Sequence, residues 1–365
     1  MDIDFAELLM DVVSRRASDL HLSAGARPTV RVRGRLSQLE EYPTLSPSDT
    51  REIVYSILNG DQRQRLETDW QLDFAYSVPG HARFRVNAYY QRGAIGAAFR
   101  LIPFGLTSID ELGLPTAAHE FTRRPRGFVL VTGPTGSGKS TSLAAMIDEI
   151  NQTREEHIMT IEDPIEFLHV HKKCLVNQRE LGSDAHSFAD ALKAALREDP
   201  DVILVGEMRD LETISTALTA AETGHLVFAT LHTQDTSQTI DRIIDVFPAH
   251  QQGQVRVQLS VALQGIMTQQ LLPSADGSGR VVATEVLVPN PAVRNLIREG
   301  KTHQIYSVLQ TGSAHGMQTM DTSLASLVRA GKITQKLAEA RSSTPEELRR
   351  LMVGADPSQG VRRAA

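Results

Sequence analysis

The sequence predicts an α/β protein with a mainly parallel sheet, preceded by a small α+β domain and followed by a helical tail. From residue 127 onward, short apolar runs alternate with helical stretches, as expected of parallel strands whose connecting helices cover both faces of a sheet. Before residue 103, the segments alternate apolar and charged residues, which is typical of strands with one solvated face. At 365 residues and 41% hydrophobic, the chain can bury more than one core.

The first domain is predicted over residues 1–103. It opens with a helix, because apolar residues recur at helical spacing at Phe5, Leu8, Leu9, Val12 and Val13. A second helix is predicted from Ser46-Pro47 to a stop at Asn59-Gly60. Strands are predicted where polarity alternates, in segments 28–36, 73–76, 81–87 and 96–102.

The second domain is predicted over residues 116–365, after a linker at 104–115. Its predicted strands are the apolar runs Phe128–Val131, Ile158–Ile161, Val202–Val205 and Leu226–Leu231. From about residue 290 the chain is predicted to be helical, and its last helix begins at Thr344-Pro345 with Glu347 completing a capping box.

Composition excludes several classes of protein. The net charge of -6 gives no overall basic surface, so we expect no nucleic-acid partner. Cys174 is the single cysteine, which excludes an intrachain disulfide and a multi-cysteine metal site. The N-terminus does not follow the pattern of a secretory signal, and no segment approaches the ~20 apolar residues of a membrane span. We therefore expect a cytoplasmic protein without direct membrane insertion.

A glycine-rich segment predicts a nucleotide site. It matches the Walker A pattern between a predicted strand and the predicted helix 140–150, and its residues are Gly133, Pro134, Thr135, Gly136, Ser137, Gly138, Lys139, Ser140 and Thr141. Backbone N–H groups of such a loop surround phosphates, Lys139 reaches the β- and γ-phosphates, and the Ser140 hydroxyl binds Mg²⁺. The predicted cofactors are thus ATP and Mg²⁺. A chance glycine loop is the alternative, which the order of strand, loop, lysine, hydroxyl and helix disfavours.

Two later strands end in carboxylates, at the sheet edge where ligands of such folds bind. The first runs into Glu162, Asp163 and Glu166. The second runs into Gly206-Glu207, where Gly206 occupies the position at which a Walker B strand ordinarily has aspartate. Glu207 is therefore the acid available at this strand end for Mg²⁺. A single strand-end acid is also consistent with a helix cap or a surface charge.

These motifs resemble those of the secretion-type ATPases, and within them the type IV pilus retraction ATPases. The resemblance extends from Ser18 to Asp321 and includes Thr160–Glu166, Gly206-Glu207, Gly224-His225 with Leu231–Thr233, and Ala292–Glu299. It implies a RecA-like ATPase core after a PAS-like domain. A single cysteine argues against the tetracysteine zinc module of the assembly and secretion relatives. By periodicity alone, Ala292–Glu299 is an ordinary amphipathic packing helix.

The resemblance also implies roles for individual residues. Glu166 would orient the attacking water, and Glu207 would hold Mg²⁺ and the γ-phosphate. His225 and His232 would sense the γ-phosphate or a neighbouring subunit, although strand-end histidines are commonly ordinary polar residues. Arg85 and Arg100 would supply charge in trans, although arginines that alternate along a strand usually mark its solvated face.

The function implied is that of a homohexameric motor ATPase. It would retract type IV pili in twitching motility, acting on the inner-membrane platform protein of the pilus from the cytoplasmic face of the membrane. Two other functions stay open. One is that of a related motor, either an accessory retraction ATPase or a type II secretion or pilus-assembly ATPase. The other is a scaffold that binds ATP without hydrolysing it.

Overall fold

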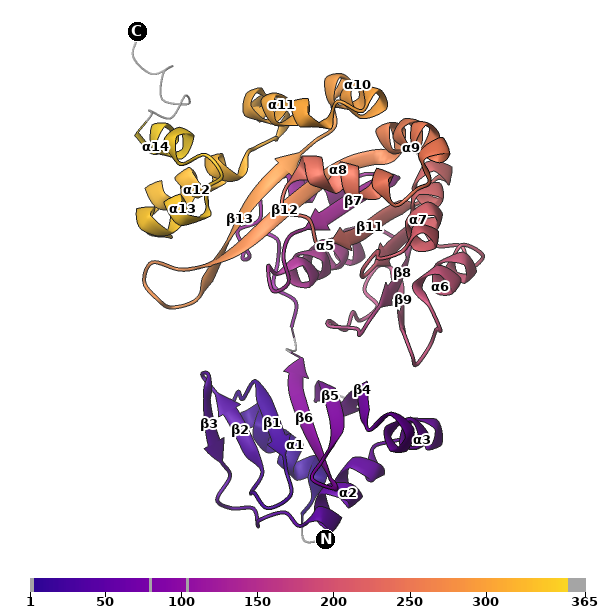
Figure 1. Cartoon of the computed structure of the whole chain (residues 1–365), viewed down its shortest axis with the longest axis vertical. Helices are drawn as coiled ribbons and strands as arrows, with labels where there is room; N and C mark the ends of the chain where they lie inside the picture. The colour runs from indigo at the N-terminus through magenta and orange to yellow at the C-terminus, as the bar shows by residue number, and fades with distance from the viewer. Residues whose placement is uncertain (1–2, 79–80, 103–104, 354–365) are drawn as a thin grey trace. The chain divides into compact units, whose positions relative to one another are not determined.

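The structure, a computed structural model, describes residues 3–78, 81–102 and 105–353 (Figure 1). The chain divides into two compact units. The first contains Met1–Gly105 and also Pro164–Leu168, and the second contains Leu106–Asp163 and His169–Ala365. Residues 103 and 104, where the sequence predicts the end of the first domain, lie outside the described residues.

The first unit is an antiparallel sheet with helices that pack on one of its faces. Strand order is β3-β2-β1-β6-β5-β4. Apolar side chains of α1 and α2, such as Leu8 and Ile53, share a core with Phe84 and Phe99 of the sheet. The elements are α1 (Phe5–Ser14), β1 (Asp19–Leu22), β2 (Thr29–Val32), β3 (Arg35–Gln38), α2 (Pro47–Ser56), α3 (Gly60–Asp69), β4 (Gln71–Val78), β5 (Ala82–Gln91) and β6 (Ala94–Ile102).

Two predicted elements of this unit differ in the structure. The single strand predicted at 28–36 is the hairpin β2–β3, because Arg33 and Gly34 both have positive φ angles and reverse the chain. Asn59, predicted as part of a helix stop, instead begins the next helix. Its side chain accepts a hydrogen bond from the Gln62 N–H, while Gln62 accepts one from the Asn59 N–H, which together form a capping box at the start of α3.

The second unit alternates strands and helices and then becomes mostly helical. Its elements are α4 (Ala117–Thr122), β7 (Gly127–Thr132), α5 (Lys139–Thr153), β8 (His157–Glu162), β9 (Leu175–Glu180), α6 (Phe188–Ala195), β10 (Val202–Val205), α7 (Leu211–Thr223), β11 (Leu226–Leu231), α8 (Thr236–Asp245), α9 (Ala249–Ala262), β12 (Leu263–Pro273), β13 (Arg280–Leu287), α10 (Pro291–Glu299), α11 (Ile305–Thr311), α12 (Met320–Arg329), α13 (Gln335–Arg341) and α14 (Pro345–Val353), with short 3₁₀ turns at Thr302–Gln304 and Ser313–His315.

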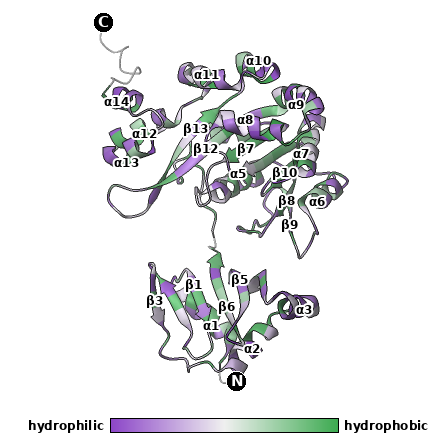
Figure 2. Cartoon of the chain, viewed as in Figure 1, coloured by the Kyte–Doolittle hydropathy of each residue, from purple (hydrophilic) through white to green (hydrophobic). Residues whose placement is uncertain are grey.

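The sheet of this unit has the order β13-β12-β7-β11-β10-β8-β9. The neighbouring strands from β12 to β9 pair in parallel, and only the edge strand β13 pairs antiparallel. Strands β7, β10 and β11 are buried along their whole length, as the continuous apolar runs predicted. Figure 2 shows the strands near β7 as mainly hydrophobic and the surrounding helices with both hydrophobic and hydrophilic parts.

The predicted fold class is confirmed: a mainly parallel sheet with flanking helices follows a small α+β unit and precedes a helical C-terminal region. The sheet has a separate core on each side, which shows that helices cover both faces. Within the described parts of the chain, no helix combines the length and the apolar character that crossing a lipid bilayer requires.

Candidate active site

The loop between β7 and α5 has a backbone path that requires glycine. Gly133 and Gly138 have φ angles of 140° and 88°, a region that L side chains rarely adopt. Gly133 also lacks room for a side chain, because a Cβ there would lie 2.3 Å from the carbonyl oxygen of Gln269. Helix α5 begins at Lys139 and has no side-chain cap, so no side chain competes with a ligand for the N–H groups of its first turn.

Lys139 folds back over this loop. Its Nζ donates to the carbonyl oxygens of Gly133 at 2.8 Å and Pro134 at 3.1 Å, and lies 3.5 Å from Nδ1 of His232. The residue is only 9% exposed. A buried cation beside an uncapped helix N-terminus strongly favours an anionic ligand, because both the charge and the helix dipole attract it.

Glu207 lies at the end of β10 and links two further polar side chains. Its Oε2 accepts from Arg209 Nη2 at 2.6 Å, and its Oε1 lies 3.1 Å from Nε2 of His232. The Arg209 hydrogen bond lowers the pKa of Glu207 below its ordinary value; burial opposes this effect and His232 adds to it. The carboxylate therefore stays ionised at neutral pH. Neutral His232 can accept from Lys139 at Nδ1 and donate to Glu207 at Nε2, which connects lysine and glutamate.

The structure explains the glycine that precedes Glu207. A Cβ at Gly206 would lie 3.2 Å from the Cα of Glu162 and 3.2 Å from the carbonyl oxygen of Ile161. The Gly206 N–H also donates to that oxygen at 2.8 Å. An aspartate at this position would crowd the neighbouring strand β8, so Glu207 is the first acid after β10.

The two predicted histidines lie at opposite ends of β11. Strand β11 is parallel to β7, with Leu226 opposite Gly127 and Leu231 opposite Thr132. His232 therefore lies at the edge with the glycine loop. His225 lies at the far edge, about 20 Å away for a six-residue strand, where its Nδ1 contacts the carbonyl oxygen of Ala220 at 3.0 Å. The structure does not bring His225 to the loop of its own chain.

The acids after β8 separate into two groups. Glu162 Oε1 accepts from Thr160 at 2.7 Å and from Gln178 at 3.2 Å, so it joins β8 to β9. Glu166 is exposed and belongs to Pro164–Leu168, the segment of this region that clusters with the first unit. Its role toward a water molecule stays a prediction.

Arg85 and Arg100 face each other in the antiparallel register of β5 and β6. Both are exposed, and Arg100 Nε bonds Asp19 Oδ1 at 3.0 Å. Burial alone raises the pKa of Asp19, but hydrogen bonds from Ser18 and Arg100 and nearby positive charge lower it overall. Like charges directly opposite each other destabilise a sheet. The structure thus places two exposed like charges opposite each other, with one of them bonded to the Asp19 carboxylate.

A cavity of about 310 Å³ lies next to the glycine loop. Leucines and a valine make its apolar walls, and Glu111 and Arg280 provide charged groups; the lining residues are Glu111, Leu112, Leu114, Ser137, Gly138, Thr141, Ser142, Gln269, Leu271, Arg280 and Val282. A cavity of this size with apolar walls and a few polar groups is typical of small-molecule sites. Because Gly138 and Thr141 are among its lining residues, the cavity lies directly beside the glycine loop.

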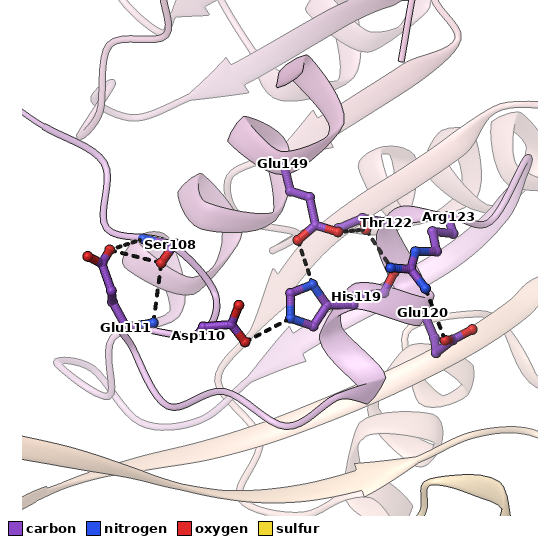
Figure 3. Close-up of polar contacts among 8 residues, drawn as sticks. All are labelled: Ser108, Asp110, Glu111, His119, Glu120, Thr122, Arg123 and Glu149. Carbon is purple, nitrogen blue, oxygen red and sulfur yellow. Dashed lines mark hydrogen bonds and ion pairs between the residues drawn. The ribbon is translucent and has the colours of Figure 1, made fainter. Parts of the chain in front are cut away.

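A cluster of charged and polar side chains next to this cavity joins α4 and Asp110 to α5, the helix that follows the glycine loop (Figure 3). His119 of α4 contacts Glu149 Oε2 of α5 through Nδ1 at 2.6 Å and Asp110 Oδ1 through Nε2 at 3.2 Å. Thr122 Oγ1 donates to the other Glu149 oxygen at 2.8 Å. Burial lowers the pKa of His119, but the two carboxylates outweigh it and raise the pKa overall. As an imidazolium, His119 donates to both carboxylates at once.

The oxygen donors at this sheet edge fit Mg²⁺ that arrives with a nucleotide. Throughout the described residues, no three His, Cys, Asp or Glu side chains converge into a metal site. The Ser140 hydroxyl and the Glu207 carboxylate remain as donors. Mg²⁺ is commonly held by one or two protein oxygens together with substrate phosphates and water, and a hydroxyl and a carboxylate can supply such oxygens.

Two residues of the site were not predicted from the sequence. Arg209 follows Glu207 by two positions, and no pattern indicates that its side chain turns back to that carboxylate. Gln269 contacts the glycine loop from β12, 132 positions away from Ser137 in the chain. Only the parallel pairing of β12 with β7 brings it there.

Comparisons with known proteins agree with this geometry. Residues 2–350 match the family described as Type II/IV secretion system protein. The type IV pilus retraction ATPase PilT of Pseudomonas aeruginosa is 52% identical over 344 residues, which cover 94% of this chain and 99% of that protein. A twitching motility protein of Neisseria gonorrhoeae is 54% identical over 321 residues, covering 88% of this chain and 86% of that protein.

A solved structure is similar over almost the whole chain. The crystal structure of the pilus retraction motor PilT with bound ADP has a TM-score of 0.90 and 53% sequence identity, and the match covers 96% of this chain and 100% of that one. The family match over residues 2–350 includes Lys139, Glu207 and His232.

Proposed function

The chain belongs to the Type II/IV secretion system protein family, and from this premise we infer that it is a motor ATPase that drives type IV pilus retraction and twitching motility. It binds adenine nucleotide and hydrolyses ATP. The observation that carries this function is the arrangement of Lys139, His232 and Glu207 at one sheet edge, in a chain similar throughout to an ADP-bound retraction motor.

The phosphates of ATP would lie in the loop Gly133–Ser140, at the N-terminus of α5. Lys139 would exchange its contacts with the Gly133 and Pro134 carbonyls for the β- and γ-phosphates, because a dianionic phosphate attracts an ammonium more strongly than a carbonyl does. The adjoining cavity, with Leu112 and Leu271 among its lining residues, would receive the nucleoside.

We assign the hydrolytic roles to residues at the same edge. Ser140 and Glu207 would hold Mg²⁺, which when bound supplies positive charge across the phosphate oxygens. His232 would couple γ-phosphate binding at Lys139 to the position of Glu207, since it contacts Lys139 on one side and Glu207 on the other. Glu166 would orient the attacking water. His225 lies too far along β11 for its own nucleotide, so its proposed role is toward a neighbouring subunit.

A homohexamer would complete the site. Arg85 and Arg100 of one subunit would neutralise phosphate charge at the nucleotide of another, as arginine fingers do. Their cross-strand pairing supports this assignment, because two exposed guanidinium groups lie side by side and the compensating carboxylate among the described residues is Asp19, bonded to Arg100.

The ring would act on the inner-membrane platform protein of the pilus, from the cytoplasmic face of the membrane. Nucleic acid is not expected as a partner because the chain is acidic overall, with a net charge of -6. Two related motors, an accessory retraction ATPase and a secretion or assembly ATPase, are the second choice. The segment Ala292–Glu299 and the single cysteine favour the retraction motor over them.

Phosphate release by the purified protein tests the function directly. Lys139→Ala should abolish turnover, because it removes the cation that lies against the phosphate-binding loop. Circular dichroism and assembly state should match the wild type, because the lysine contacts loop carbonyls rather than the apolar cores. Wild-type turnover in this variant would overturn the assignment. Inactive wild-type protein that still binds ATP would indicate a scaffold instead.

Deletion of the gene separates retraction from assembly. Loss of twitching with excess surface pili is the expected result, since pili would still be assembled but not withdrawn. A strain without pili would instead assign the motor to assembly.

A further inference from the structure

Gln269 is a buried amide that lies directly against the phosphate-binding loop. It is 1% exposed, and its Nε2 donates to the carbonyl oxygen of Ser137 at 2.7 Å. The backbone carbonyl oxygen of Gln269 occupies the space that a Cβ at Gly133 would need, at 2.3 Å. Gln269 therefore contacts both ends of the loop, from a strand that reaches this position by pairing in parallel with β7.

The hydrogen bond to Ser137 determines the direction of the next N–H group. The Ser137 carbonyl and the Gly138 N–H belong to one planar trans peptide, in which the two groups point in opposite directions. When Gln269 holds the carbonyl toward β12, the Gly138 N–H must point away from β12, into the loop. Phosphate-binding loops work through N–H groups that point inward.

This peptide requires an external support because the residue after it is glycine. Gly138 has a φ angle of 88°, which a glycine can leave at little cost, so the peptide before it can reorient. The Gln269 amide prevents this, and it sits close enough that a Cβ at Gly138 would lie 3.3 Å from its Nε2.

Only one end of this amide is paired. Its Oε1 is buried and has no hydrogen-bond partner among the described residues, and the buried Ser137 Oγ is in the same situation. A buried polar atom without a partner costs free energy, which offsets part of what the Nε2 bond to the Ser137 carbonyl contributes to stability. The clear structural effect of the side chain is therefore to fix the Ser137–Gly138 peptide.

We propose that Gln269 is a positioning residue for nucleotide binding, which orients the Ser137–Gly138 peptide so that its N–H group meets the phosphates. This inference rests on the proposed nucleotide site. It concerns binding rather than the chemical step, so it predicts a larger effect on KM and on nucleotide affinity than on kcat.

The first test measures ADP binding to full-length variants by calorimetry. Gln269→Met keeps length and burial but removes the donor, which leaves the Ser137 carbonyl unpaired. The dissociation constant for ADP should rise about 10- to 100-fold, with kcat at saturating ATP within about threefold, since the catalytic acids are untouched. Gln270→Met is the matched control, because Gln270 follows on the same strand, is less buried and does not line the cavity; its affinity should be unchanged.

A second variant separates hydrogen bonding from packing. Gln269→Glu keeps the shape, but its ionised carboxylate cannot donate to the Ser137 carbonyl. A protonated carboxyl can donate, and burial raises the pKa of a carboxyl group. The ratio of variant to wild-type dissociation constants should therefore fall as the pH is lowered from 8.5 to 6.

The outcomes are distinct. Gln269→Met or Gln269→Glu binding ADP at pH 8.5 within twofold of wild type would overturn the proposal. If the Met variant is less stable, the increase in its melting temperature caused by ADP still reports affinity and decides the question. Wild-type protein that does not bind ADP would instead remove the nucleotide site itself.

Discussion

At the level of single residues, both oxygens of Glu207 are engaged, one by Arg209 and one by His232. A metal ion that binds this carboxylate would compete with these partners for its lone pairs. Arg209 is the easier to displace, because its side chain is 68% exposed and such ion pairs contribute only about 0–1 kcal/mol. His232 then stays in contact with Glu207 and Lys139, which keeps the three groups connected.

Glu207→Gln and Glu166→Gln should fail in different ways. Loss of the Glu207 charge should weaken the use of Mg²⁺, so the Mg²⁺ concentration for half-maximal ATPase activity rises. Glu166→Gln should leave that concentration unchanged and lower kcat. Each loss is expected to be about 10²- to 10⁴-fold in turnover at ordinary Mg²⁺, with ADP affinity largely retained.

Steady-state ATPase assays over a Mg²⁺ titration distinguish the two glutamates. Glu212→Gln is the control, because Glu212 is exposed on α7 and pairs with Lys193 away from the site. A Glu207→Gln enzyme with normal turnover and normal Mg²⁺ dependence would show that its carboxylate has a structural role only.

Single residues were predictable where one local pattern defines them. Lys139 and Glu207 stand at fixed offsets from a strand end, and the sequence places both correctly at one sheet edge. Gln269 and Arg209 were not predictable, because their roles depend on side-chain direction and on a strand pairing between distant segments. His225 and His232 lie at opposite ends of β11, so the role of His225 toward the γ-phosphate or a neighbouring subunit stays a prediction.

At the level of elements, periodicity predicted most of the strands and helices that build the site. It failed where a local turn overrides the pattern, as at Arg33-Gly34, which divides one alternating segment into two strands. The long strands β12 and β13 were not predicted, although β12 supports the phosphate loop. Their residues mix polar and apolar types, so neither strand shows a continuous apolar run. Gln269 is one such polar residue, and it is buried where it contacts the glycine loop.

The His119 cluster makes the stability of the second unit depend on pH. Because the folded-state pKa lies above the ordinary value of 6.5, the stabilisation is fully present below pH 6.5 and is lost as the pH rises through the folded-state pKa. Neutral His119 can donate to only one of Asp110 and Glu149. The loss should be about 1 kcal/mol, since Glu149 is partly buried and Asp110 is largely exposed.

Thermal unfolding at pH 6 and pH 8.5 measures this contribution. Wild type should be more stable than His119→Gln at pH 6 by a few degrees, and the difference should shrink at pH 8.5. Glu120→Gln is the control, because Glu120 lies on the same helix and its ion-pair partner among the described residues is Arg123, at 3.5 Å. A difference that is constant with pH would mean that His119 contributes packing and not charge.

At the level of the whole molecule, each of the two units has its own hydrophobic packing and carries a different group of predicted site residues. The second unit holds the nucleotide loop, Lys139 and Glu207 around a buried parallel sheet. The first unit holds Arg85 and Arg100 on an antiparallel sheet with its own core. The sequence predicted both folds from their different periodicities. It could not predict the direct opposition of the two arginines, because register depends on the length of the hairpin between them.

Mixed rings test whether these arginines act on the nucleotide of another subunit. Arg100→Ala subunits keep an intact nucleotide loop, and Lys139→Ala subunits keep intact arginines, so each should be inactive alone. If the arginine acts in trans, a mixed ring can pair an intact loop with an intact arginine, and partial ATPase activity should return. The physical reason is that Lys139 alone does not neutralise the charge of the phosphoryl-transfer transition state.

The mixing experiment needs proof of assembly and a matched arginine control. Native mass spectrometry should show rings that contain both variants, and wild-type activity should rise more steeply than linearly with protein concentration until assembly is complete. Arg123→Ala is the control for lost surface charge, because Arg123 directly follows α4, is exposed and, among the described residues, forms an ion pair with Glu120; it should stay active alone. Demonstrably mixed rings without activity, together with wild-type activity strictly proportional to concentration, would instead place the complete site within one chain. Arg100 would then serve to hold Asp19, with which it is paired at 3.0 Å.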